Sequence, residues 1–225
     1  MVSVRTPRTP LRRCCYGALL AFVGFFLMAA LAYPGGNWID PGASGFDPLR
    51  NFWSDLLRER ALDGSSNALG AALARAGFGA LALGLSAFWI LAAGSFRHPL
   101  AARLLIVAGL VSSVATLGVA LLPSDRFPTL HPVAALVAGG LGFGCVVGCA
   151  LRSLLQWRGH RLRAVLALSL LAAAAANIVL FVRVAYFEAQ LTAAVPAVQK
   201  LATLLLLAWM SSVLARPNGN HHPEA

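Results

Sequence analysis

Asp125 and His131 are the residues of this chain whose types and spacing could perform acid–base chemistry. They lie six residues apart in the stretch LLPSDRFPTLHP, Leu121 to Pro132. A carboxylate that orients an imidazole lets that imidazole act as a general base, which makes a membrane hydrolase or transferase one hypothesis. The stretch also has the composition of a turn, because prolines stand where one helix can end and the next can begin. We favour the turn, since neither Ser54 nor Ser124 lies in a recognisable nucleophile elbow.

Metal and disulfide chemistry find little support in the sequence. A catalytic zinc site needs about three protein ligands, and His131 is the only histidine on its side of the membrane under the topology derived below. Cys145 and Cys149 lie one helical turn apart in apolar sequence and lack the CxxC spacing of a zinc site. We therefore expect no metal and no cofactor.

Five further residues are candidates for binding a ligand. Arg75 lies eight residues into a long apolar run, where a charge costs at least about 2–3 kcal/mol unless it is paired, hydrated or able to reach the headgroups. Other polar side chains gather near the same ends of the apolar runs, which predicts an outward-opening polar pocket. Its candidate residues are Arg75, Asn177, Arg183, Glu188 and Lys200. Their excess of positive charge favours an anionic lipid or amphiphile, and snorkelling of Arg75 to the headgroups is the alternative.

The positions of all these residues depend on six apolar runs. The chain of 225 residues is 59% hydrophobic and 12% charged, whereas soluble proteins carry about 25% charged residues. Each run can cross a bilayer as a helix of about 20 residues. The runs extend from Cys14 to Tyr33, Asn67 to Gly94, Arg103 to Leu122, His131 to Leu155, Ala164 to Ala189 and Pro196 to Ala215. The predicted fold class is all-α, a polytopic membrane protein with a six-transmembrane-helix bundle.

Basic residues predict the domain organisation and the orientation in the membrane. Residues 1–13 form a basic cytoplasmic N-terminus, residues 14–215 the transmembrane domain, and residues 216–225 a polar C-terminal tail. Arg and Lys are more frequent on the side of the N-terminus, so both termini are placed in the cytoplasm and the protein in the plasma membrane. A cleaved signal peptide is the alternative for the first run. The net charge of +10 follows this topology, so we expect the lipid bilayer and no nucleic acid as a partner.

The longest outer connection, Pro34 to Ser66, is expected to carry a short amphipathic interfacial helix. Asp47 is suited to cap this helix and Pro48 to be its first residue. Apolar residues then repeat at helical spacing along one face, while Asn51, Asp55 and other polar residues occupy the opposite face. We expect the helix to lie in the membrane interface as an anchor, with a lid over a pocket as the alternative.

Small residues recur at four-residue spacing in two of the runs. Gly140, Gly144 and Gly148 form one row, and Ala72, Ala76, Ala80 and Gly84 form the other. Such rows let helices approach closely, which matters in lipid because packing must supply the attraction. We expect packing within the chain. The alternative is a non-catalytic membrane subunit that meets a partner helix through the first row.

Three stretches resemble a family of bacterial and archaeal six-span integral membrane proteins of unknown function, domain of unknown function nine-nine-eight. They are NFWSDLL, NALGAALARAGFGALALG and ALLPSDRFPTLHPVAALVAGGLGF, within roughly residues 48–143. The resemblance implies signature positions at Ser54, Asp55, Pro123, Asp125 and His131. The chain departs from the family pattern before the proline, where it has Leu in place of Phe. The family implies six spans and no particular activity.

The function predicted from these residues is that of an integral membrane protein that binds a lipid or small amphiphile in an outward-facing polar pocket. Two alternatives stand beside it. One is a membrane-embedded hydrolase or transferase that uses Asp125 and His131, and the other is the non-catalytic subunit.

Overall fold

The chain folds into six long helices and one short one. The computed structural model describes residues 8–155, 161–187 and 190–215. The long helices are α1 (Arg8–Ala32), α2 (Ala68–Ala93), α3 (Pro99–Leu121), α4 (Leu130–Leu155), α5 (Arg161–Tyr186) and α6 (Ala194–Leu214), and a 3-10 helix, η1, spans Trp53–Leu57. Over the described residues there is no β-strand, and six helices are long and apolar enough to cross a membrane. The prediction of an all-α six-helix bundle is confirmed.

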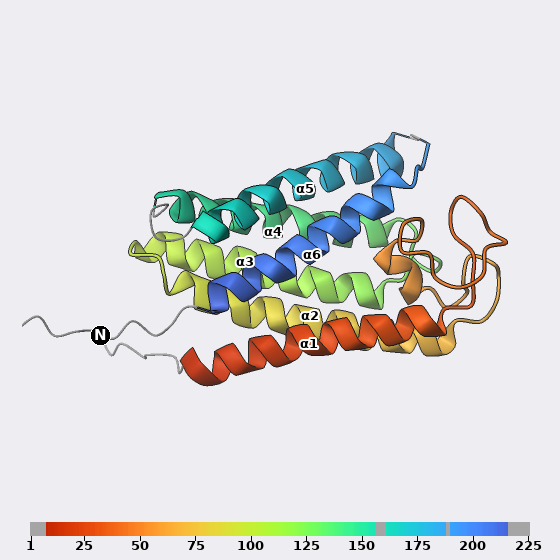
Figure 1. The fold of residues 1–225 in the computed structure, drawn as a ribbon, viewed down its shortest axis with the longest axis horizontal. Coiled ribbons are helices and arrows are strands. Elements are labelled where there is room, and N and C mark those ends of the chain that lie inside the picture. Colours follow the sequence, from red (N-terminus) through yellow and green to blue (C-terminus); the bar gives the residue numbers. More distant parts are fainter. Residues whose placement is uncertain (1–7, 156–160, 188–189, 216–225) are drawn as a thin grey trace, which may run out of the picture.

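The long helices run side by side along one axis of the molecule (Figure 1). Every pair of consecutive helices is packed together, whereas α6 touches α1 only sparingly. One of those contacts joins the Tyr16 hydroxyl to the Ser211 carbonyl oxygen at 3.4 Å. The start of α1 and the end of α6 share one end of the bundle, called here the terminal end (Figure 1). The connection between α1 and α2, residues 33–67, lies at the opposite end, called the loop end.

Small residues bring α1 and α2 together, although they are not the predicted row. Gly77 lies against Phe26 of α1, and Gly84 also faces α1. These two glycines are seven residues apart, which places them on one face of α2. Ala72 and Ala76 are exposed, whereas Ala80 packs against the core, so the prediction that their row packs within the chain is correct only for Ala80 and Gly84.

The glycine row of α4 faces away from the bundle. A methyl group added to Gly140, Gly144 or Gly148 would meet nothing within 4 Å. The expected packing of this row within the chain is therefore wrong. Gly142 faces α3 instead, where an added methyl group would lie 3.1 Å from the Ser112 hydroxyl oxygen. A role for the exposed row at a partner helix stays a prediction.

Aromatic side chains fill the bundle toward the terminal end. Phe88, Trp89 and Trp209 are buried, and their ring centroids lie 5.0 to 6.4 Å apart. Gly109 of α3 makes room for this cluster, because a methyl group there would lie 2.6 Å from the Trp89 Cβ atom. The Cβ atom is fixed by the backbone of α2 and cannot rotate away. The approach of α3 to α2 therefore depends on glycine at this position.

We expect Gly109→Ala to destabilise the protein while Gly118→Ala on the same helix does not. Alanine normally favours a helix over glycine by up to about 1 kcal/mol, but overpacking against Trp89 costs about 1–3 kcal/mol. At Gly118 the added methyl group meets Ala134 at 3.8 Å, an ordinary contact. Thermal unfolding in detergent measures the difference. Equal melting temperatures for the two variants would contradict the close packing of α3 on α2.

Candidate functional site

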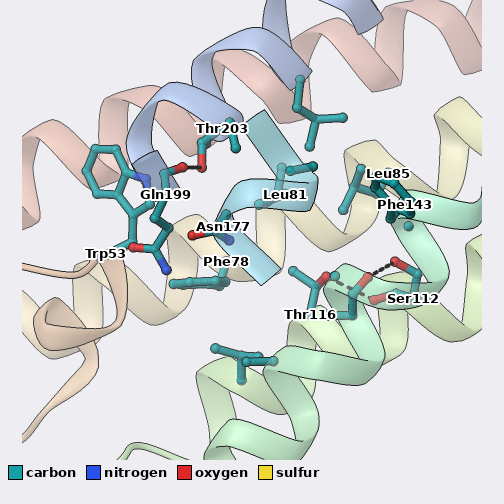
Figure 2. Close-up of a pocket in the computed structure, with 18 of the residues that line it drawn as sticks. Trp53, Phe78, Leu81, Leu85, Ser112, Thr116, Phe143, Asn177, Gln199 and Thr203 are labelled. Atoms are coloured by element: carbon teal, nitrogen blue, oxygen red, sulfur yellow. Dashed lines mark hydrogen bonds between the residues drawn. The ribbon is translucent and has the colours of Figure 1, made fainter. Parts of the chain in front are cut away.

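A cavity of about 260 Å³ lies inside the bundle. All six long helices and η1 contribute to its wall. Its volume is slightly below the range of common ligand pockets, about 300–1,000 Å³, so it suits one small or slender molecule. Figure 2 shows that the polar side chains Asn177 and Gln199 gather in one part of the wall and Leu85 and Phe143 in another.

The part of the cavity toward the terminal end is apolar. It is lined by Leu81, Leu85, Trp89, Phe143, Val146, Leu170 and Leu206. Two hydroxyl groups also occur in this part of the wall, but both are bonded to backbone oxygen atoms. Ser112 donates to the Ala138 carbonyl oxygen at 2.7 Å, and Thr116 donates to the Ser112 carbonyl oxygen at 2.9 Å. Because these hydroxyl groups already have acceptors, this part of the wall offers a ligand mainly apolar contact.

Most polar side chains of the lining gather toward the loop end, beside apolar ones such as Phe26, Phe78 and Phe181. The polar side chains of this part include Trp53, Ser54, His131, Asn177, Gln199 and Thr203. Gln199 is bonded within the protein: its side-chain oxygen accepts the Trp53 backbone N–H at 3.0 Å, and its carbonyl oxygen accepts the Thr203 hydroxyl at 2.9 Å. Among the described residues, the Asn177 amide has no hydrogen-bond partner, and neither does the buried indole Nε1 of Trp53.

His131 contributes a hydrogen-bond acceptor to this polar part. It stands in the first turn of α4 and is 6% exposed. Its Nδ1 atom lies 2.7 Å from the Leu122 carbonyl oxygen. Because a carbonyl oxygen can only accept, the neutral ring carries its proton on Nδ1, and Nε2 is left with a lone pair. His131 lines the cavity, so a ligand hydroxyl or amide group could donate to it.

Asp125 holds the chain next to the cavity and does not orient the imidazole. Within the described part of the chain, its carboxylate accepts the backbone N–H groups of Glu59 and Arg60 at 2.9 and 3.4 Å and makes no hydrogen bond to His131. Through these hydrogen bonds, the turn after α3 holds the end of the α1–α2 connection in place. A catalytic role for Asp125 and His131 stays a prediction.

The α1–α2 connection folds over the loop end of the cavity. Its short helix, η1, begins at Trp53, five residues later than the expected start at Pro48. Asp47 caps a single turn instead, because its carboxylate accepts the backbone N–H two residues later at 2.8 Å. Leu56 and Leu57 are fully buried. The helix therefore packs into the bundle. The anchor predicted from the sequence would instead have lain flat in the membrane interface.

Asp55 organises this connection from a buried position, with 2% of its surface exposed. Its carboxylate accepts the Trp38 indole N–H at 3.0 Å, the Phe52 backbone N–H at 2.7 Å and the Asn51 amide at 3.3 Å. Burial away from water raises the pKa of Asp55, and these hydrogen bonds act against that rise. The carboxylate fixes the backbone around the two residues that η1 contributes to the cavity wall.

α6 holds the connection from the opposite side. The Lys200 ammonium group donates to the Asn51 carbonyl oxygen and, at 3.4 Å, to the Pro196 carbonyl oxygen. It also lies 5.0 and 5.5 Å from the ring centroids of Trp53 and Phe46, within the distance at which a cation is attracted to an aromatic face. Lys200 is buried but is not part of the cavity lining. Its charge stabilises the connection over the cavity.

Arg75 pairs with an acidic side chain of the protein itself. Its guanidinium group lies 3.3 Å from the Glu59 carboxylate, which also pairs with Arg126 at 2.6 Å. The three side chains are partly exposed, so each pair contributes little to stability by itself. This cluster joins α2, the connection and the turn after α3 at the loop end. Arg75 is not part of the cavity lining.

The remaining predicted binding residues fall in different places. Asn177 lines the cavity, whereas Arg183 is exposed in the last turn of α5. Glu188 lies outside the described residues, as do residues 1–7 and the tail 216–225. The described parts of the chain contain no group of three or more His, Cys, Asp or Glu residues placed to hold a metal ion.

Sequence reasoning missed Trp53 as a cavity residue and the burial of Asn51 and Asp55. An amphipathic repeat predicts that one face of a helix lies in apolar surroundings. The repeat is the same whether those surroundings are lipid or the interior of a helix bundle. The overlooked signal is the composition of residues 37–55, NWIDPGASGFDPLRNFWSD. Its Asn, Asp and Trp side chains can satisfy the backbone of an irregular segment, which is what a buried connection requires.

Comparison with protein families, with characterised proteins and with solved structures finds no match for this chain. The resemblance to the six-span family therefore stays a prediction, and the function of the cavity is argued from its own geometry.

Asp55 is expected to make the protein less stable as the pH rises, an effect that Asp55→Asn removes. Burial raises the pKa of this carboxyl group above its ordinary value of 3.8, so the folded protein keeps the proton to higher pH than the unfolded chain. Unfolding then releases a proton between the two pKa values, and the free energy of unfolding falls as the pH rises through that window. Thermal unfolding between about pH 4 and pH 8 compares the two proteins. Parallel curves for wild type and Asp55→Asn would contradict the burial of this group.

Proposed function

We propose that this chain is a multi-pass membrane protein that binds one lipid or small amphiphile in its central cavity. The observation that carries the proposal is the uneven polarity of the wall: most of its polar side chains lie toward the loop end, and the wall toward the terminal end is mainly apolar. An amphiphile has the same two parts. Its polar group would bond beneath the α1–α2 connection, while its chain would gain contacts with the apolar wall.

The dimensions of the cavity favour a single slender chain. Phe78 and Trp89 both line it and are eleven residues apart on α2, which corresponds to about 16 Å along a helix. A volume of about 260 Å³ distributed over that length leaves a narrow channel. A ligand with two acyl chains would require the helices to separate.

The distribution of charge supports an orientation with both ends of the chain in the cytoplasm. Among the described residues, every Asp and Glu lies at the loop end together with basic residues, whereas the charged residues of the terminal end are all basic. The basic residues of the terminal end are Arg8, Arg12, Arg13, Arg97, Arg103, Arg152, Arg161 and Arg163, and those of the loop end are Arg50, Arg58, Arg60, Arg75, Arg126, Arg183 and Lys200. Positive charge near span ends favours the cytoplasmic side. In the plasma membrane, this orientation would place the polar part of the cavity at the level of the outer leaflet.

A matched pair of substitutions on α5 tests the proposal. Ala174 lines the cavity, whereas Ala176 is exposed on the outside of the bundle. We expect Ala174→Phe to fill the cavity and to lower the occupancy of a bound lipid at least about tenfold, a loss of about 1.4 kcal/mol or more. Native mass spectrometry of the detergent-purified proteins measures the one-to-one adduct.

Ala176→Phe is the control, because it adds the same ring to the same helix. It should keep the adduct of the wild type. An adduct of equal occupancy on all three proteins would place the lipid on the outer surface of the bundle. The absence of a defined adduct from the wild type would contradict the proposal directly.

A further inference from the structure

The cavity wall has polarity but no formal charge. Among the described residues that line it, none is Asp, Glu, Lys or Arg. The polar lining consists of indole, hydroxyl, imidazole and amide groups. A charged headgroup placed there would lose its water without gaining an opposite charge, which is costly in apolar surroundings. An uncharged polar group loses less hydration and can be satisfied by hydrogen bonds alone.

Three charged side chains of the loop end, Arg75, Lys200 and Asp55, are already used by the protein. Arg75 is paired with Glu59. Lys200 donates to the Asn51 carbonyl oxygen and lies against the ring of Trp53. Asp55 accepts hydrogen bonds from the connection itself. A ligand carrying a charge would have to break one of these arrangements to pair with any of these three side chains.

Several neutral groups of the lining remain for a ligand in the polar part, among them those of Trp53, Asn177 and His131. The Trp53 indole Nε1 is a buried donor without a partner among the described residues. The Asn177 amide supplies both donors and an acceptor from α5 (Figure 2). His131 presents the acceptor Nε2 because its Nδ1 is bonded to Leu122. The wall therefore offers both donors and acceptors, which a hydroxyl or carboxamide group can use together.

We propose that the ligand is a single-chain amphiphile whose polar group is uncharged, such as an alcohol, an amide or a monoglyceride. This inference rests on the proposed function and adds the chemical class of the ligand. The anionic ligand predicted from the sequence depended on Arg75, Arg183 and Lys200, and none of these three side chains lines the cavity.

Three probes with the same twelve-carbon chain test the charge of the polar group. They are 1-monolauroylglycerol, which is neutral, dodecyl phosphate, which is anionic, and dodecyltrimethylammonium, which is cationic. Binding to the full chain in a bulky neutral detergent is measured by native mass spectrometry, from the fraction that carries one probe molecule across a concentration series. We expect the neutral probe to bind at least about tenfold tighter than either charged probe. Ala174→Phe should abolish its binding, which locates it in the cavity.

The outcomes separate this inference from the proposed function. Equal binding of all three probes, or tighter binding of a charged one, overturns the uncharged class while the cavity still binds an amphiphile. Failure of all three to bind overturns both proposals.

Two variants locate the polar group of the probe. Asn177→Leu keeps the approximate size of the side chain but removes its hydrogen bonds, so we expect 1-monolauroylglycerol to bind about three- to tenfold more weakly. Arg75→Gln should leave its binding unchanged. If Arg75→Gln weakens the binding and Asn177→Leu does not, the polar group lies at the ion pair and the inference is overturned.

Discussion

Polar groups enclosed by apolar helices have to find their partners within the protein, and the loop end of this bundle is built around that constraint. Asn51, Asp55 and Asn67 are almost completely buried there. Asn51 bonds to the Gly36 carbonyl oxygen, and Asn67 bonds to the carbonyl oxygens of residues 56 and 58. These side chains replace the water that an exposed loop would use. The connection can therefore enter the bundle and present Trp53 and Ser54 to the cavity.

The cavity exists because the helices around it differ in the size of their side chains. α1 and α2 present Phe, Leu and Trp side chains to it, whereas α4 presents mainly Ala and Gly. Two glycines of α4, Gly139 and Gly142, and Ala174 of α5 leave space that the larger side chains opposite do not fill. Small residues thus have two roles in this chain. They bring α1 and α2 into close contact at Gly77 and Gly84, and they keep the centre of the bundle open.

The fold could be predicted from the sequence because apolar length alone indicates a membrane-spanning helix. Asn177 could be predicted as a site residue as well, because an amide deep in an apolar run needs a hydrogen-bond partner. The partner of Arg75 could not be found, because Glu59 is sixteen residues away across an irregular connection. The burial of Asp55 could not be predicted from the sequence either. Whether an amphipathic segment turns its apolar face to lipid or to the bundle depends on contacts between elements distant in sequence, such as that between Trp53 and Gln199.

The succession of contacts along the chain has a consequence for how the protein is assembled. Each long helix packs on the one made just before it, so most of the bundle can form hairpin by hairpin during synthesis with little loop-closure entropy. The connection between α1 and α2 is an exception, because Gln199 and Lys200 of the last helix bond to it. The first connection to be synthesised, between α1 and α2, thus waits for the final helix before its contacts are complete, and the cavity acquires its cover at the last step of folding.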